Sequence, residues 1–169
     1  MLRQVTENRF PNLDSTLGSM SGTDLLPKPT YGRLPVFMTG GGRQEMEWIA
    51  QNVDGCLFYT LPLEQQDLNI QRWCRLTAQR GEPGYKPFNQ ATYIDLSENP
   101  NAMTRAIHQG LSLGREPLLQ YLKAWEKVGV DQLMINFKHS RRPVGDVMAE
   151  FAEHILPHFP AGSRATEVK

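Results

Sequence analysis

Short apolar runs alternate with amphipathic segments along most of the chain. Residues 34–38 form the clearest run, which contains no polar residue and is followed, after Thr39, by three consecutive glycines. Parallel strands that are buried on both faces have this pattern. Further runs rich in aliphatic, aromatic and β-branched residues predict strands at 56–59, 88–96 and 131–137. We therefore expect four strands.

Amphipathic helices are predicted between and after these strands. Apolar residues recur at i, i+3, i+4 and i+7 in 46–53, and a longer helix is expected at 63–80. A helix at 116–128 has Gly129 as its expected cap, and Pro143 begins the last helix. The residues expected to face inward are Ile70, Trp73, Cys74 and Thr77; Leu118, Leu119, Leu122 and Trp125; and Val147, Met148, Phe151, Ala152 and Ile155.

Three stretches lack such a period. Glycines and prolines interrupt residues 1–33, which we interpret as an irregular linker arm. Residues 97–114 are expected to be irregular, with a short helix at about 102–108. The polar residues 161–169 predict a disordered tail. The domain proper is then 34–160, with four strand–helix units.

The alternation of strands and helices predicts an α/β protein with a parallel sheet. Two architectures remain open at this point. One is an open, doubly wound sheet, and the other is a piece of a (β/α)₈ barrel. A complete barrel needs about 250 residues and eight strands, whereas this chain has 169 residues.

Composition limits the classes of partner. The 18 Lys and Arg residues balance 18 Asp and Glu residues, so no long-range field attracts nucleic acid or anionic lipid. No apolar run approaches the ~18 residues of a membrane span, and the amino terminus lacks a signal-peptide pattern. We expect a cytoplasmic protein. Cys56 and Cys74 are not in metal-binding spacing and are interpreted as buried apolar residues in a reducing compartment.

The loop after the first strand is the strongest candidate for binding chemistry. In parallel α/β folds, ligands bind at the carboxyl ends of the strands. Gly40, Gly41 and Gly42 leave backbone N–H groups free to face an anion, Thr39 adds a hydroxyl and Arg43 adds a charge. This loop is either a phosphate cradle or a flexible turn. It lacks the P-loop and dinucleotide motifs.

Two other loops carry polar residues at the same expected edge. The loop after the last strand contains Lys138, Arg141 and Arg142. It would bind an acidic substrate or a phosphate, cover a flavin edge, or only pair nearby acids. The third loop contains His108 and Arg115, and a lone histidine in a loop is more often a hydrogen-bonding residue than a base.

No other pattern marks a reaction centre. Asp95 and Glu98 end the third strand and could act as acid and base, although only their position marks them. His154 and His158 flank Pro157 at a helix end, so we expect no metal site. No serine–histidine–acid or cysteine–histidine arrangement can be assigned.

Several segments together resemble the bacterial luciferase-like flavin monooxygenases, and specifically their oxidoreductase subgroup. Residues 34–55 (LPVFMTGGGRQEMEWIAQNVDG) show the family's order of apolar strand, small-residue loop, helix and Asp-Gly pair. The stretches 86–88 (KPF), 113–115 (LGR), 128–131 (VGVD), 141–143 (RRP) and 156–160 (LPHFP) resemble the same subgroup. The similarity runs from about residue 13 to residue 161.

The resemblance implies the C-terminal half of a (β/α)₈ TIM barrel that binds reduced FMN or the deazaflavin F420. In such enzymes the reduced flavin reacts with O₂ and a small organic substrate is oxidised. The residues similar to the family's phosphate loop are Thr39, Gly40, Gly41 and Gly42, with Arg43 beside them. The family often has serine where this chain has Gly41 and Gly42, so only backbone donors remain.

The resemblance also implies that the first four strands of the barrel are missing from this chain. The family's catalytic residues lie there and cannot be assigned here, and residues 1–33 resemble the segment between the two halves. Substrate or flavin-edge candidates are Tyr59, His108, Arg115, Lys138 and Arg141.

Three hypotheses follow. The chain is the C-terminal portion of a flavin-dependent monooxygenase, a non-catalytic truncated half-barrel that serves as a flavin-binding or assembly module, or an independent phosphate-binding α/β domain. We expect flavin and a small molecule as ligands, and either a homo-oligomer or pairing with a missing N-terminal half-barrel. An uncovered half-barrel leaves apolar surface and sheet edges exposed.

Overall fold

The computed structural model describes residues 2–79 and 84–160. The chain divides into two compact units, Met1–Val36 and Phe37–Lys169. The expected tail at 161–169 lies outside the described residues.

The first unit contains only short elements. These are helix α1 (Leu2–Glu7) and the antiparallel strands β1 (Leu13–Ser15) and β2 (Gly18–Met20). The Lys28 ammonium donates hydrogen bonds to the carbonyl oxygens of Val5 (2.9 Å) and Asn8 (2.7 Å) at the end of α1, and it pairs with Asp24. That this unit serves as a linker arm stays a prediction.

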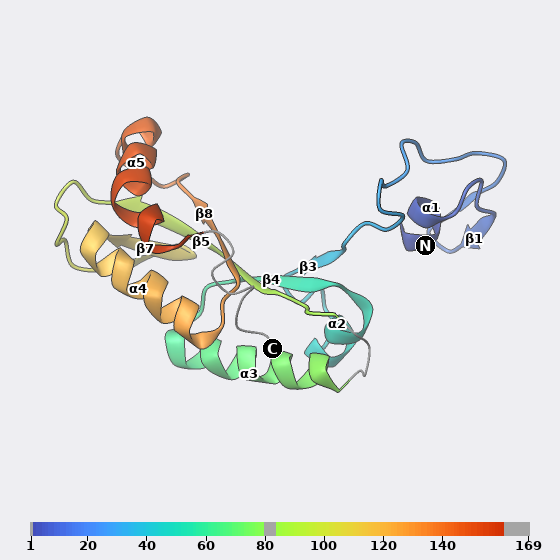
Figure 1. The fold of residues 1–169 in the computed structure, drawn as a ribbon, viewed down its shortest axis with the longest axis horizontal. Helices are drawn as coiled ribbons and strands as arrows, with labels where there is room; N and C mark the ends of the chain where they lie inside the picture. Colours follow the sequence, from blue (N-terminus) through green and yellow to red (C-terminus); the bar gives the residue numbers. More distant parts are fainter. Residues whose placement is uncertain (1, 80–83, 161–169) are drawn as a thin grey trace. The chain divides into compact units, whose positions relative to one another are not determined.

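The second unit contains the predicted strand–helix series (Figure 1). Its elements are β3 (Phe37–Thr39), α2 (Met46–Asn52), β4 (Gly55–Tyr59), α3 (Leu63–Ala78), β5 (Phe88–Leu96), β6 (Arg105–Ile107), β7 (Gly110–Leu113), α4 (Arg115–Val128), β8 (Gln132–Asn136) and α5 (Val144–Glu150). Helix α5 continues as a π-helix, Phe151–Ile155, and a 3₁₀ turn, Leu156–His158.

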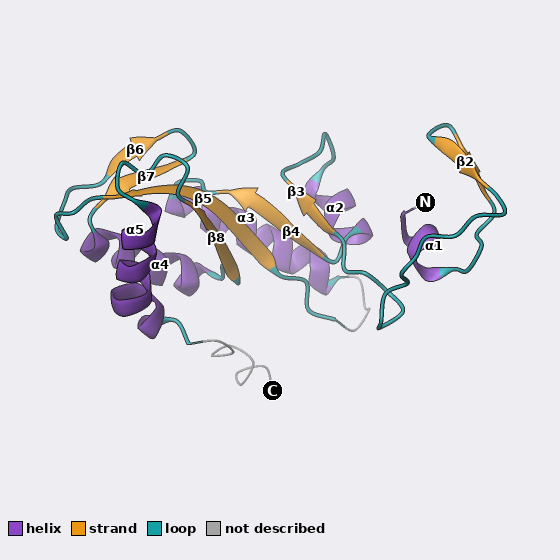
Figure 2. Cartoon of the chain, turned by 90° about the horizontal axis from the view of Figure 1, so that it is seen from above, coloured by secondary structure: helices purple, strands orange, loops and turns teal. Residues whose placement is uncertain are grey.

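The four predicted strands are present and form a parallel, curled half-barrel sheet, although the first lies at Phe37–Thr39 and not at 34–38. Strand β3 pairs with β4, β4 with β5, and β5 with β8, all in parallel. Figure 2 shows helices α3 and α4 against one face of this sheet. A half-barrel is therefore the observed architecture, in place of the open doubly wound alternative.

The expected short helix at about 102–108 is wrong. That stretch forms the antiparallel hairpin β6–β7, and β7 adds to β5 in parallel. Odd-numbered β5 residues bond to β4 and β7 alike, because the Ala91 carbonyl accepts from Thr60 N–H (3.3 Å) and Tyr93 N–H donates to the Gln109 carbonyl (3.1 Å). Alternate residues of a parallel strand bond to opposite neighbours. Strand β7 therefore continues the β4 side of β5 beyond the end of β4.

The hydrophobic core lies between the sheet and its helices. The Trp73 ring of α3 packs edge-on against Phe88 of β5, with ring centroids 6.4 Å apart. Gly129 caps α4 in the left-handed conformation, as expected (φ 109°). The predicted inward residues that are buried are Ile70, Trp73, Leu118, Leu119, Leu122, Trp125, Val147, Phe151 and Ile155.

Three residues expected to face inward are exposed instead, namely Cys74, Met148 and Ala152. Helix α5 and its π-helical continuation bury Val147, Phe151 and Ile155 at i, i+4 and i+8 spacing. Met148 and Ala152 each follow a buried position by one residue, which turns them about 100° away from the sheet. The wider apolar stripe predicted for this helix therefore has only its central row covered.

Among the described residues of the second unit, no helix packs on the other face of the sheet, which is partly apolar. Because Phe88 faces the helices, odd-numbered β5 residues face the other side, and register neighbours share a face. This inner face includes Phe37, Tyr59 and Met134, whose exposed fractions are 43%, 44% and 53%.

Candidate functional site

The glycine loop after β3 is built from backbone in the left-handed conformation. Gly40, Gly42 and Arg43 have φ values of 61°, 53° and 60°, and a side chain is rare in this region. Gly40 N–H donates to the Leu57 carbonyl (2.9 Å), and Gln44 N–H donates to the Gly41 carbonyl (2.8 Å). The first bond fixes the loop to β4, and the second closes a turn within the loop.

The loop presents three consecutive backbone donors. Among the hydrogen bonds between described residues, none uses the N–H groups of Gly41, Gly42 or Arg43. All three residues are exposed. Such a turn of unpaired N–H groups is a concavity suited to anions. Gly40 does not add its N–H, because that group is bonded to β4.

Thr39, which precedes this loop, and Tyr59 lie on the inner face of the sheet. Thr39 is in register with Leu57 on β4, and Tyr59 is two residues farther along that strand. Helix α2 begins with Met46 and carries Glu47 in its first turn, so its amino end is not purely electropositive. The anion-binding potential of the region therefore comes from the loop backbone.

A second polar group lies beyond the end of β4, on the inner face of β5 and β7. The Asp95 carboxylate is 5% exposed and accepts hydrogen bonds from the Ser112 hydroxyl (2.8 Å) and the Arg141 backbone N–H (3.1 Å). It also accepts one from Arg141 Nε (2.9 Å). Burial by itself would raise the pKa of Asp95, but the bonds from Ser112 and Arg141 lower it below the ordinary value.

The loop after β8 places an aromatic contact beside this carboxylate. The His139 imidazole packs on the Tyr93 ring, with centroids 4.8 Å apart. Tyr93 precedes Asp95 by two residues, so both side chains lie on the inner face of β5. Lys138 is exposed in the same loop, whereas His108 is in the two-residue turn of the β6–β7 hairpin.

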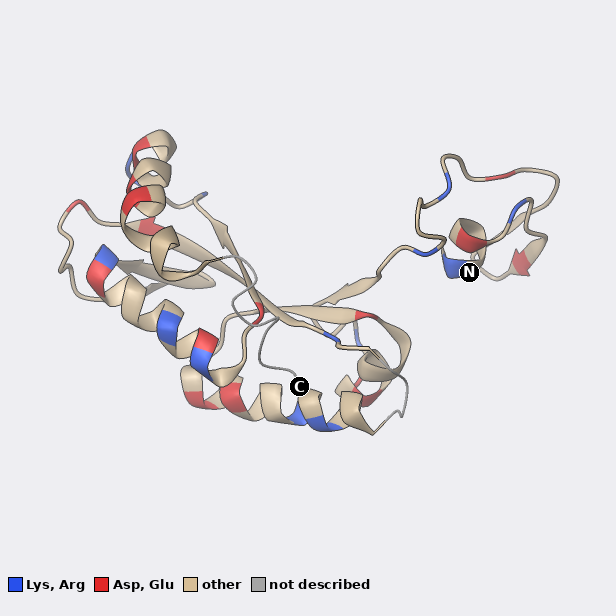
Figure 3. Cartoon of the chain, in the orientation of Figure 1, with Lys and Arg blue, Asp and Glu red and all other residues tan. Residues whose placement is uncertain are grey.

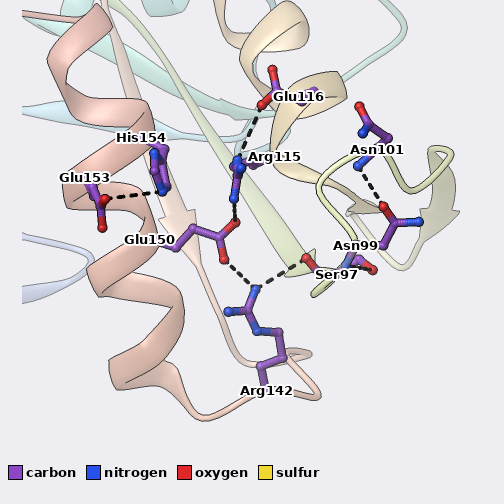
Figure 4. A network of polar contacts seen from close by, with 9 residues as sticks. All are labelled: Ser97, Asn99, Asn101, Arg115, Glu116, Arg142, Glu150, Glu153 and His154. Carbon is purple, nitrogen blue, oxygen red and sulfur yellow. Dashed lines mark hydrogen bonds and ion pairs between the residues drawn. The ribbon is translucent and has the colours of Figure 1, made fainter.

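Arg115 and Arg142 bind a carboxylate in the helix layer (Figure 4). The Glu150 carboxylate of α5 accepts from Arg115 Nη1 (3.3 Å) and Arg142 Nη1 (2.7 Å). Arg142 Nη1 also donates to the Ser97 carbonyl (3.3 Å). Burial acts to raise the pKa of Glu150, but the two arginines lower it. The structure therefore keeps Arg115 apart from the Asp95–Arg141 group.

Nothing in the structure favours a nucleophilic role for the two cysteine thiols. Both are free, and burial raises the pKa of the Cys56 thiol to about 12, so this thiol is a poor nucleophile at neutral pH. Within residues 2–79 and 84–160, no group of three His, Cys, Asp or Glu side chains could hold a metal ion. No helix in that part of the chain has the length and apolar character to cross a membrane.

Sequence reasoning singled out the loop that contains His139, but it missed Ser112 as a partner of Asp95 and Glu150 as a partner of Arg115 and Arg142. Ser112 reaches Asp95 only because the hairpin folds back on β5, and no local period predicts that pairing. Glu150 could not be recognised from the sequence, because an acid at that position of a helix is indistinguishable from an ordinary exposed one. Asp95 was recognised by its position at a strand end.

Comparison with known proteins identifies the fold. No protein-family model and no curated protein matches the chain. An F420-dependent secondary alcohol dehydrogenase is 11% identical, with a TM-score of 0.71 over 92% of this chain and 58% of that chain. A monooxygenase from Streptomyces bottropensis is 12% identical, with a TM-score of 0.72 over 94% of this chain and 59% of that chain.

A third solved structure is a coenzyme F420-dependent tetrahydromethanopterin reductase from Methanopyrus kandleri. It is 8% identical, with a TM-score of 0.72 over 94% of this chain and 61% of that chain. The chain thus spans 58–61% of the length of these three structures. At such low identity the likeness establishes the fold, and the predicted resemblance to luciferase-like barrels is confirmed at that level.

Proposed function

We propose that this half-barrel is the C-terminal portion of a luciferase-like, flavin-dependent oxidoreductase, and that it holds the phosphate of the flavin. The glycine loop after β3 carries this proposal, because it offers three unpaired backbone N–H groups at the carboxyl end of a barrel strand. The fold likeness to F420-dependent enzymes and to a monooxygenase supports a flavin or deazaflavin ligand.

The residues present fit a phosphate group. The N–H groups of Gly41, Gly42 and Arg43 would donate to phosphate oxygens, and the Arg43 guanidinium would add charge from the same turn. Thr39 lies at the end of β3 and offers a hydroxyl on the inner face. Half-exposed Tyr59 would provide an apolar wall beside the cofactor.

The bound reduced flavin would supply the reaction with O₂. This chain would bind and orient the cofactor, while the missing N-terminal half-barrel would supply the catalytic residues and exclude water. The expected partners are therefore a flavin, a small organic substrate and that second half.

A substitution at Gly41 tests the phosphate site. Its φ is outside the left-handed region, and an added Cβ would lie 3.7 Å from the Gln44 carbonyl, an ordinary contact. Gly41→Asp should weaken FMN binding at least about tenfold, because a carboxylate would face the phosphate. Gly41→Ala, the matched control, should stay within about threefold of the unchanged chain.

Quenching of flavin fluorescence measures this affinity, with F420 titrated in parallel to identify the preferred cofactor. If Gly41→Asp binds FMN and F420 as tightly as Gly41→Ala does, the phosphate site is not in this loop and the proposal fails.

The uncovered inner face favours a second candidate function, a non-catalytic flavin-binding or assembly module. It predicts that the purified chain binds flavin but does not raise O₂ consumption above the spontaneous rate of reduced flavin in buffer. An oxygen electrode tests the second candidate, since substrate-dependent O₂ consumption by the isolated chain above that spontaneous rate would exclude it.

A further inference from the structure

The charged residues of the sheet lie in one row of neighbouring register positions, formed by Asp95, Ser112 and Arg105. In the strands of the six-stranded sheet, as far as the structure describes them, Asp95 and Arg105 are the only charged residues. Figure 3 shows the contrast, with most Lys, Arg, Asp and Glu of this unit on helices and loops. Asp95 is in register with Ser112 on β7, and Ser112 is in register with Arg105 on β6. The three side chains therefore share the inner face.

The Asp95 carboxylate accepts several hydrogen bonds, whereas its partner Arg141 still has hydrogen-bonding capacity to spare. Asp95 is buried and engaged by Ser112 and by the backbone and side chain of Arg141. Arg141 uses Nε and Nη2 for these contacts, yet its side chain is 67% exposed. No hydrogen bond between described residues uses its Nη1. A guanidinium held along one edge keeps its other edge available for a planar oxyanion.

Arg105 adds a second cation at the other end of the row. It is exposed, and it makes no ion pair or hydrogen bond through its guanidinium with any residue in the described ranges. Arg105 and Arg141 therefore outnumber the single acid between them, and the row carries net positive charge. The Tyr93–His139 stack borders the same face.

We propose that Arg141 and Arg105 bind the anionic group of the small substrate, a carboxylate or phosphate oxyanion, and that Asp95 and Ser112 are positioning residues for Arg141. The inference rests on the proposed function, because it assigns the substrate class of the same barrel mouth.

The glycine loop and this row are too far apart to share one phosphate. Thr39 is in register with Leu57, and Leu57 with Asn89 of β5. Asp95 lies six residues beyond Asn89 on that strand, from 95 − 89. At about 3.3 Å per residue this is roughly 20 Å along the strand from the level of Thr39, after which the loop begins, and the spacing of two strands across the sheet adds to it. The row therefore faces a second anionic group and not the phosphate that the loop would hold.

Titration with benzoate and its neutral isostere benzamide tests the site, with the Arg Nε–H and backbone amide resonances of the chain followed by NMR. Benzoate should bind saturably and benzamide should not. Arg141→Gln should weaken benzoate at least about tenfold, since charge-assisted hydrogen bonds are lost. Arg75→Gln, at an exposed arginine of α3, is the matched control and should leave the affinity unchanged. Ser112→Ala should give a smaller loss together with a shifted Arg141 Nε–H resonance.

The outcomes separate this inference from the proposed function. Gly41→Asp should leave benzoate binding intact, and Arg141→Gln should leave FMN binding within about threefold. Equal responses to benzoate and benzamide, or an unchanged benzoate affinity in Arg141→Gln, would overturn the substrate assignment. Loss of FMN binding in both Gly41→Asp and Arg141→Gln would show that Arg141 binds an anionic group of the cofactor and not of the substrate. Unchanged FMN binding in Gly41→Asp, with benzoate lost in Arg141→Gln, would reject the phosphate loop alone.

Discussion

At the scale of single residues, contacts distant in sequence decide what each position tolerates. A Cβ on Gly110 would lie 1.9 Å from the Tyr93 carbonyl oxygen, and one on Gly114 would lie 2.2 Å from the Pro100 carbonyl oxygen. Gly41, in contrast, has room for a side chain. All three are glycines in expected loops, and their neighbours in sequence do not distinguish them. The candidate phosphate loop could be found from its glycines, whereas these steric requirements depend on the folded chain.

The ion pairs of Glu150 with Arg115 and Arg142, here called the Glu150 clamp, should make stability depend on pH in the acidic range. Its folded pKa is lowered below the ordinary value of 4.5, so its contribution is fully present above that value and is lost as the pH falls through the folded pKa. The pKa of Asp95 is likewise lowered below its ordinary value of 3.8, so its contribution to stability is also lost as the pH falls. Urea denaturation should give nearly constant stability between pH 7 and pH 6 and a decline below about pH 4.5.

Glu150→Gln should lower the free energy of unfolding at pH 7 by about 1–3 kcal/mol, because two half-buried arginines lose their carboxylate. It should also flatten the acid decline. Glu98→Gln, at an exposed acid in a loop, is the control and should change stability by less than about 0.5 kcal/mol. An acid decline that is the same in Glu150→Gln and the unchanged chain would show that the clamp does not contribute.

At the scale of elements, local periodicity predicted the four parallel strands and the helices between them. It failed where pairing decides the structure. Residues 105–107 have no strand signal of their own and become β6 only because Gly110–Leu113 lies beside β5. In α5, the sequence shows a broad apolar stripe, yet only its central row meets the sheet. Val144, Met148 and Leu156 remain 46%, 58% and 58% exposed.

The β6–β7 hairpin should depend on Gly110. Gly110→Ala forces a Cβ into the Tyr93 carbonyl, so it should destabilise the protein by about 1–3 kcal/mol. Amide exchange should accelerate most at Ser97, whose N–H bonds to Leu113. Gly145→Ala in α5 is the matched control, because nothing lies within 4 Å of its Cβ. This change should be neutral or stabilise by up to about 1 kcal/mol. Equal stabilities of the two variants would contradict the hairpin register.

At the scale of the whole domain, the main feature is a curled sheet that the described helices cover on one face only. The inner face exposes Phe37, Tyr59 and Met134, and β3 and β8 each have one parallel neighbour in the described sheet. Apolar surface and open strand edges of this kind favour association. The fold class was predictable because each strand–helix unit is locally encoded, whereas local sequence patterns do not tell what closes the sheet.

The exposed inner face predicts that this half-barrel associates with a second half. Sedimentation velocity of the purified chain over a range of concentrations tests it most directly. A half-barrel with an exposed inner face should show concentration-dependent association or aggregation, which a charge at Met134, on that face, should reduce. A monodisperse monomer that unfolds cooperatively at all concentrations would contradict the claim and would favour an independent α/β domain.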